Sequence, residues 1–193
     1  MRGGVDGNER LTAASGVILV VLLAAEGVTI LSIRQLVSAH VFIGMLLIPP
    51  TALKLGTTGW RFVRYYAGAR EYREKGAPLL PLRLLAPLVV AATVAVFATG
   101  VALIVVGPQN GFLLGLHKAS FVVWFAATGL HVLAYVRRVP ALAVADWRRR
   151  VASVDGAFAR RLVLAAVLVA GAILAVATVR YAQPWVHFRG GDG

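Results

Sequence analysis

The sequence contains no cysteine. This absence excludes disulfide bonds, iron–sulfur clusters, thiolate metal sites and the Cys-x-x-Cys-His attachment of covalent haem. Any metal chemistry in the chain must therefore use histidine. The sequence also lacks a nucleotide-binding, flavin-binding or hydrolytic motif, so it does not predict a complete enzyme of those classes.

Charged residues are scarce as well. They make up 15% of the 193 residues, whereas 59% are hydrophobic, and a soluble domain carries about 25% charged residues. The apolar residues form runs of about 20, which is the length that a helix needs to cross a hydrocarbon layer about 30 Å thick. We therefore predict an all-α, polytopic membrane helix bundle that forms a single transmembrane domain over residues 1–193.

The apolar runs predict five transmembrane helices, at 12–33, 36–55, 83–107, 112–136 and 160–182. The first run is also compatible with a cleaved signal peptide. It continues past Glu26 to Ile33 without a clear small-residue cleavage site, which favours a retained span. In the second run, Pro49 and Pro50 predict a kink. After it, the aromatic residues Trp60, Tyr65 and Tyr66 are expected at the headgroup level, and the alternating aromatic and basic residues at 57–72 are also compatible with a helix lying on the membrane surface.

The basic residues are unevenly distributed over the predicted loops. Sixteen of the twenty Lys and Arg residues fall on one side of the five helices, and the turn at 107–111 on the other side carries no charge. Short basic loops stay in the cytoplasm. This pattern predicts a plasma-membrane protein with a cytoplasmic N-terminus and an external C-terminus. Topology and contact with anionic lipid explain the net charge of +12 without a nucleic-acid partner.

Three of the four histidines, His40, His117 and His131, lie inside predicted spans. An imidazole in hydrocarbon is unfavourable unless it is paired or ligated, so each of them either bonds a neighbouring helix or binds a metal. His117 and His131 are fourteen residues apart, which places them on one helix face about 21 Å apart along the axis. His40 and Lys54 have the same spacing. Because the second and fourth helices run in parallel, His40 and His117 are expected at one depth on the external side, where two imidazoles would suit a six-coordinate haem iron.

Segments 116–120 (LHKAS) and 129–132 (GLHV), opposite 39–44 (AHVFIG), resemble the small di-haem membrane cytochromes b. That superfamily includes the cytochrome subunits of hydrogenases and formate dehydrogenases and the ferric-reductase-like membrane domains. The resemblance covers about 36–136. It implies a four-helix core that holds haem b and passes electrons between membrane quinone and an oxidoreductase partner.

The resemblance implies that His40 and His117 are the axial ligands of an external haem and that His131 is one ligand of an inner haem. Lys54 stands where the fourth ligand is expected. It is either an unusual amine ligand or a lysine that extends to the headgroups, and the second interpretation is favoured. One haem is therefore expected, with a second uncertain.

Other residues near the external end fit this interpretation. Gly44, one turn from His40, would leave room for a flat porphyrin, although glycine is also common in membrane helix packing. Arg34 and Lys118 are either partners of haem propionates or solvated interface charges.

Glu26 lies about two-thirds of the way along the first helix, near the expected level of His40 and His117. A carboxyl group at that depth needs a partner, a proton or a polar cavity. It is either a proton relay beside a quinol site or a protonated side chain bonded to a neighbouring helix. The leading hypothesis is thus an electron-transfer subunit, and the alternative is a haem-free membrane scaffold or a small proton-coupled transporter.

Overall fold

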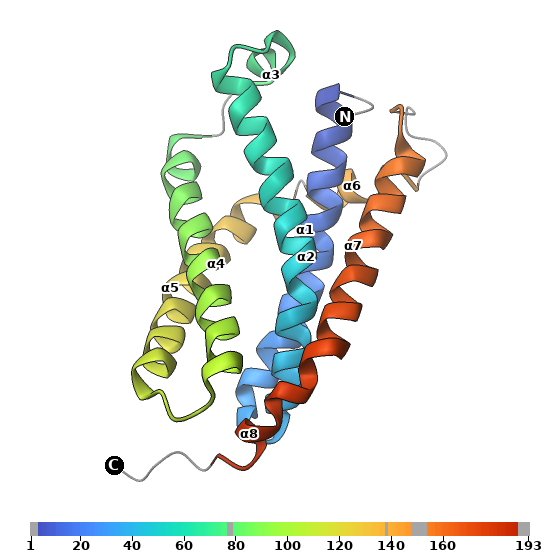
Figure 1. The fold of residues 1–193 in the computed structure, drawn as a ribbon. Coiled ribbons are helices and arrows are strands. Elements are labelled where there is room, and N and C mark those ends of the chain that lie inside the picture. The colour runs from blue at the N-terminus through green and yellow to red at the C-terminus, as the bar shows by residue number, and fades with distance from the viewer. Residues whose placement is uncertain (1–3, 77–78, 138, 148–153, 189–193) are drawn as a thin grey trace.

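The computed structural model describes residues 4–76, 79–137, 139–147 and 154–188, and every regular element in these residues is a helix (Figure 1). The long helices are α1 (Gly4–Leu31), α2 (Ile33–Tyr66), α4 (Leu80–Val106), α5 (Gly111–Tyr135) and α7 (Ala157–Thr178). The short ones are α3 (Arg70–Glu74), α6 (Val139–Ala143), the 3₁₀ helix η1 (Val179–Ala182) and α8 (Gln183–Val186). The described residues hold five helices long and apolar enough to cross a membrane, α7 counting together with η1 and α8.

The side chains are distributed as in a protein whose outer surface faces lipid. Large apolar side chains are exposed along the long helices, including Leu31 at 85% and Phe112 at 83%. Small polar side chains are buried between the helices, among them Ser15 and Thr57. A soluble bundle has the opposite arrangement. The predicted all-α, polytopic membrane bundle is therefore confirmed.

Four of the five predicted spans match the structure to within three residues at their starts, and the first two are longer than predicted. α1 begins at Gly4 rather than at 12, and α2 continues to Tyr66 rather than ending at 55. Apolar runs measure only the part of a helix that lies in hydrocarbon. Both extensions carry polar and charged residues, so they escaped a search for apolar runs.

The segment at 57–72 does not form one surface-lying helix, and that prediction is wrong. Its first part continues α2, and the chain then turns into the short helix α3 (Figure 1). Lys75, just after α3, bonds Asp6 at 2.7 Å and Glu9 at 2.8 Å on α1. Trp60 Nε1 donates to the Tyr72 hydroxyl at 3.2 Å. These contacts fold the segment back on α1 and α2.

The predicted kink at Pro49 and Pro50 is also wrong. The backbone keeps helical dihedral angles there, and the non-helical residue inside α2 is Leu36, with φ −110° and ψ 16°. Pro50 is fully buried. Membrane helices tolerate proline where neighbouring helices support the freed backbone groups, and α1 and α7 both pack against α2.

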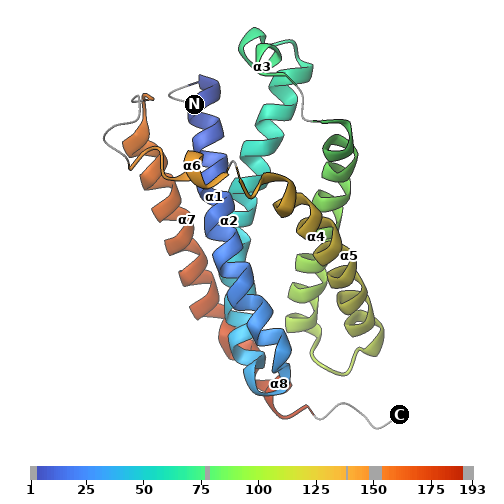
Figure 2. The same cartoon turned by 180° about the vertical axis from the view of Figure 1, so that it is seen from behind.

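The bundle consists of two parts that make few direct contacts. α1, α2, α6 and α7 pack closely together, and α4 packs along α5 as a hairpin (Figures 1 and 2). Both views show α2 and α5 running in the same direction, as predicted. The α4–α5 hairpin meets the rest only at a few points on α2 and η1 among the described residues.

A buried ion-pair cluster joins α1 to the segment between α6 and α7. Arg160 donates to Asp146 through Nε at 2.5 Å and Nη2 at 2.7 Å, and Arg10 donates to the same carboxylate at 3.0 Å. The Arg160 hydrogen bonds hold the pKa of Asp146 below its usual value. This contribution to stability is present above the usual carboxyl pKa and is lost as the pH falls through the lowered value.

Gly171 permits the close approach of α7 to α2. A Cβ at this position would lie 2.5 Å from the backbone oxygen of Leu46. Gly171→Ala should therefore force the helices apart and lower the free energy of unfolding by about 1–3 kcal/mol, seen as a lower melting temperature in detergent. Gly129→Ala is the matched control, because a Cβ there meets nothing within 4 Å and alanine favours a helix by about 1 kcal/mol. Equal melting temperatures for the two variants would contradict the α2–α7 contact.

Candidate functional site

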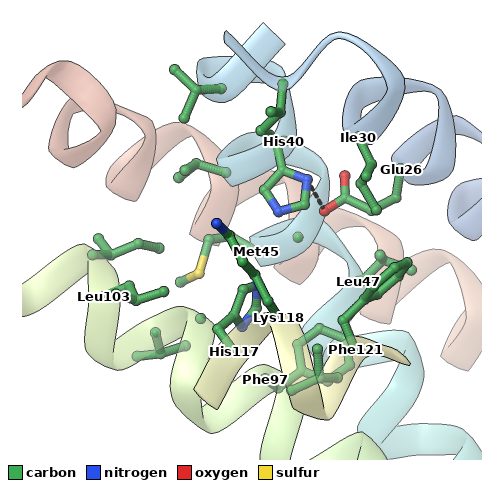
Figure 3. A pocket seen from close by; sticks show the side chains of 18 of the residues that line it. Glu26, Ile30, His40, Met45, Leu47, Phe97, Leu103, His117, Lys118 and Phe121 are labelled. Carbon is green, nitrogen blue, oxygen red and sulfur yellow. Dashed lines mark ion pairs between the residues drawn. The ribbon is translucent and has the colours of Figure 1, made fainter. Parts of the chain in front are cut away.

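A cavity of about 300 Å³ lies between the α1–α2 pair and the α4–α5 hairpin. These four helices and Trp185 of α8 line it, mostly with apolar side chains. Its ionisable lining residues are Glu26, His40, His117 and Lys118 (Figure 3). The cavity therefore brings together four residues that the sequence singled out.

The two histidines lie opposite each other across this cavity. His40 is seven residues into α2 and His117 six residues into α5, so two parallel helices present them at one depth. Their ring centroids are 6.5 Å apart, with an angle of 78° between the ring planes. The prediction that they share one depth and face each other is confirmed.

Nδ1 of His40 faces two groups on α1. It lies 2.9 Å from Glu26 Oε1 and 3.0 Å from Thr29 Oγ1. The Thr29 hydroxyl donates its own proton to the Glu26 backbone oxygen at 2.6 Å, so it can only accept from the ring. An ionised Glu26 accepts as well, and in this arrangement the proton of the His40 ring lies on Nδ1. The predicted common level of Glu26 and His40 is confirmed by this contact.

His117 is held in the same way by α4. Its Nδ1 lies 3.0 Å from Thr99 Oγ1. The Thr99 hydroxyl donates to the backbone oxygen of Ala95 at 2.7 Å, which again makes it an acceptor toward the ring. Gly100 lets the ring approach α4, because a Cβ there would lie 3.2 Å from His117 Cε1.

The consequence is the same for both rings. A neutral imidazole with its proton on Nδ1 has a lone pair on Nε2. The contacts of His40 with Glu26 and Thr29, and of His117 with Thr99, are all made by Nδ1. In metal sites a ligating histidine typically donates its other N–H to a carboxylate or another oxygen. The site thus offers two imidazoles in the form that binds a metal.

Gly44 and Lys118 line the cavity, whereas Arg34 does not. Gly44 lies beside the Glu26 carboxylate, since a Cβ there would be in van der Waals contact with Oε1 at 3.4 Å. Lys118 reaches the cavity from α5 (Figure 3). Arg34 is exposed at the start of α2, which favours the solvated interpretation of that residue.

Lys54 and His131 are outside this cavity. Lys54 does not extend to the headgroups as predicted, because its Nζ donates to the backbone oxygen of Thr12 at 2.6 Å and packs beside Gly16. His131 packs against Tyr135 with ring centroids 5.1 Å apart. Its Nδ1 is buried without a hydrogen-bond partner among the described residues. The two residues do not form a pair like His40 and His117.

Sequence reasoning missed the residues that orient the two rings. Thr29 and Thr99 were not singled out, although hydroxyl groups in membrane spans often bond a neighbouring helix. Trp124 also lines the cavity, and its Nε1 donates to Thr93 Oγ1 at 3.1 Å. The signal in the sequence was weak, because threonine is common in spans without any such role.

Comparisons with protein-family models, curated proteins and solved structures found no match for this chain.

Proposed function

We propose that the protein is a membrane b-type cytochrome that holds one haem between His40 and His117. The observation that carries this proposal is the pair of imidazoles 6.5 Å apart across an apolar cavity, each with its Nδ1 occupied by an oxygen acceptor.

The separation of the rings suits a shared iron. With metal–nitrogen distances of about 2 Å, as for imidazole on zinc, and about 1 Å from each nitrogen to its ring centroid, two axial imidazoles have centroids about 6 Å apart. The measured 6.5 Å is close to this value.

The ligand set also favours a porphyrin over a bare metal ion. A bare ion such as zinc takes three or four protein ligands, and the described residues contain no group of three or more His, Asp or Glu that could hold one. A porphyrin supplies the remaining ligands itself, so two histidines suffice. Without cysteine in the chain, the haem would be bound non-covalently.

The other residues that line the cavity suit the apolar ring system and the charged propionates of a haem. Phe97, Phe121 and Trp124 give an apolar wall that would exclude water from the ring system. The Lys118 amine lies at the cavity and would pair with a propionate, as a cation does with a carboxylate. Haem supplies one-electron chemistry when bound, and the chain's residues hold it and set its surroundings.

For the role of the chain, we propose an electron-transfer subunit between membrane quinone and a partner oxidoreductase. Support comes from the half-buried position of the histidine pair within the bundle and from the absence of a nucleotide-binding, flavin-binding or hydrolytic motif in the sequence. The haem-free scaffold or transporter is the alternative that the following experiments address.

The ligand assignment predicts distinct spectra for the histidine variants. His40→Ala and His117→Ala should each abolish or convert the low-spin haem spectrum, because each removes one of the two proposed axial imidazoles. His187→Ala is the control and should leave the spectrum unchanged, since His187 is exposed at the end of α8. His131→Ala should also spare this haem. Wild-type reduced spectra in both His40→Ala and His117→Ala would refute the assignment.

The contacts of Lys54 predict one haem per chain. Its amine is committed to α1 through Thr12, and His131 lacks a second histidine opposite it. A pyridine haemochrome assay on the purified protein should therefore return one haem per polypeptide. A value of two would contradict this, and loss of one haem in Lys54→Ala would then identify the amine as a ligand.

The distribution of basic residues predicts the orientation in the plasma membrane. With five spans and a cytoplasmic N-terminus, a reporter fused after Gly193 should be external. A phosphatase active only outside the cytoplasm should work in this fusion, and a fluorescent protein that folds only in the cytoplasm should not. The reverse result would place the histidine pair in the cytoplasmic half of the bilayer.

A further inference from the structure

The two histidines differ in what their Nδ1 atoms meet. His117 donates to the neutral hydroxyl of Thr99, whereas His40 faces the Glu26 carboxylate at 2.9 Å in addition to Thr29. Figure 3 shows the Glu26 side chain reaching the His40 ring from α1, on the side of the ring away from His117. Only one of the two proposed ligands thus has a carboxyl group as a partner.

The surroundings strengthen this contact. Only 13% of the Glu26 side chain is exposed, and the cavity wall beside it is largely apolar, so water screens the interaction poorly. The Thr29 hydroxyl lies 3.5 Å from the second carboxylate oxygen of Glu26. Gly44 lies beside the carboxylate, since a Cβ there would be in van der Waals contact with Oε1 at 3.4 Å.

A carboxylate that accepts the Nδ1 proton makes the imidazole more basic and more electron-donating at Nε2. This hydrogen bond is charge-assisted and about twice as strong as one to a neutral hydroxyl. A more strongly donating axial ligand favours ferric over ferrous iron, and hydrogen bonding around an axial ligand is one of the means by which a protein sets the potential of haem.

We propose that Glu26 is a positioning residue that fixes the His40 tautomer and lowers the reduction potential of the iron. This inference rests on the proposed haem at His40 and His117, and it assigns Glu26 a role separate from proton transfer to or from quinol. Thr29 supports the same arrangement as a second acceptor for Nδ1.

The test is a redox titration of purified Glu26→Gln at one pH, alongside the wild type. Glutamine keeps an oxygen acceptor but removes the charge. The ferric–ferrous equilibrium should shift toward ferrous iron by about tenfold, which is 59 mV for a one-electron couple, while the low-spin spectrum persists. Thr99→Val should shift the ferric–ferrous equilibrium by a smaller factor, because the His117 ring loses only a neutral hydrogen-bond partner.

Glu74→Gln is the matched control, since it makes the same chemical change at an exposed carboxylate paired with Arg70. It should leave the potential unchanged. A haem-loaded Glu26→Gln protein with the wild-type potential would overturn the inference while leaving the proposed haem site intact. A wild-type protein without haem would instead overturn the proposed function.

A second measurement decides the question if Glu26→Gln does not retain haem. The infrared difference spectrum between reduced and oxidised wild-type protein should contain a glutamate carboxylate band, identified by its shift on ¹³C-glutamate labelling, because Glu26 senses the charge on the iron through His40. The band should persist in Glu74→Gln. Absence of any redox-linked glutamate band in the haem-loaded wild type would overturn the inference.

Discussion

A polar ring inside a hydrocarbon layer needs an acceptor for its N–H, because neither lipid nor water provides one there. In this chain α1 provides that acceptor for His40, through Glu26 and Thr29, and α4 provides it for His117, through Thr99. Each histidine is therefore tied to the helix that precedes its own in the sequence. The α1–α2 pair and the α4–α5 hairpin are each built around such a bond, and the cavity lies where the two pairs face each other.

The close packing of these helices depends on the positions of glycine residues. Gly100 leaves space for the edge of the His117 ring, because a Cβ there would lie 3.2 Å from Cε1. Gly171 on α7 leaves space for the backbone of α2. Without a hydrophobic force between helices in lipid, close backbone approach and interhelical hydrogen bonds hold a bundle together. The close contacts occur within each part of the bundle, and the space between the two parts is left for the cavity.

The sequence predicted the five spans and the opposition of His40 and His117, because both follow from regular helix geometry and from the lengths of the apolar runs. It also placed Glu26 at their level. It did not predict which helix would meet each Nδ1, since that depends on the rotation of α1 and α4 about their axes. An apolar run leaves this rotation undefined, because lipid accepts apolar side chains on every side.

Lys54 is another residue whose hydrogen-bond partner the sequence did not predict. Its spacing from His40 suggested either a ligand or a side chain reaching the headgroups, but its amine bonds a backbone oxygen of α1. Thr12 was already inside the span predicted for the first helix, so the length of α1 does not explain the missed bond. The bond depends on how α1 is rotated and packed against α2, and an apolar run does not define this.

The position of the histidine pair has a consequence for electron flow in the proposed function. His40 lies seven residues from the start of α2, about 10 Å along the helix axis. The opposite half of α2 and α5 holds Lys54 bonded to α1 and a His131 without a second histidine. One redox centre near one face cannot carry electrons across the full bilayer. In the proposed orientation, the donor and the acceptor of this cytochrome must therefore both approach from the external half of the membrane.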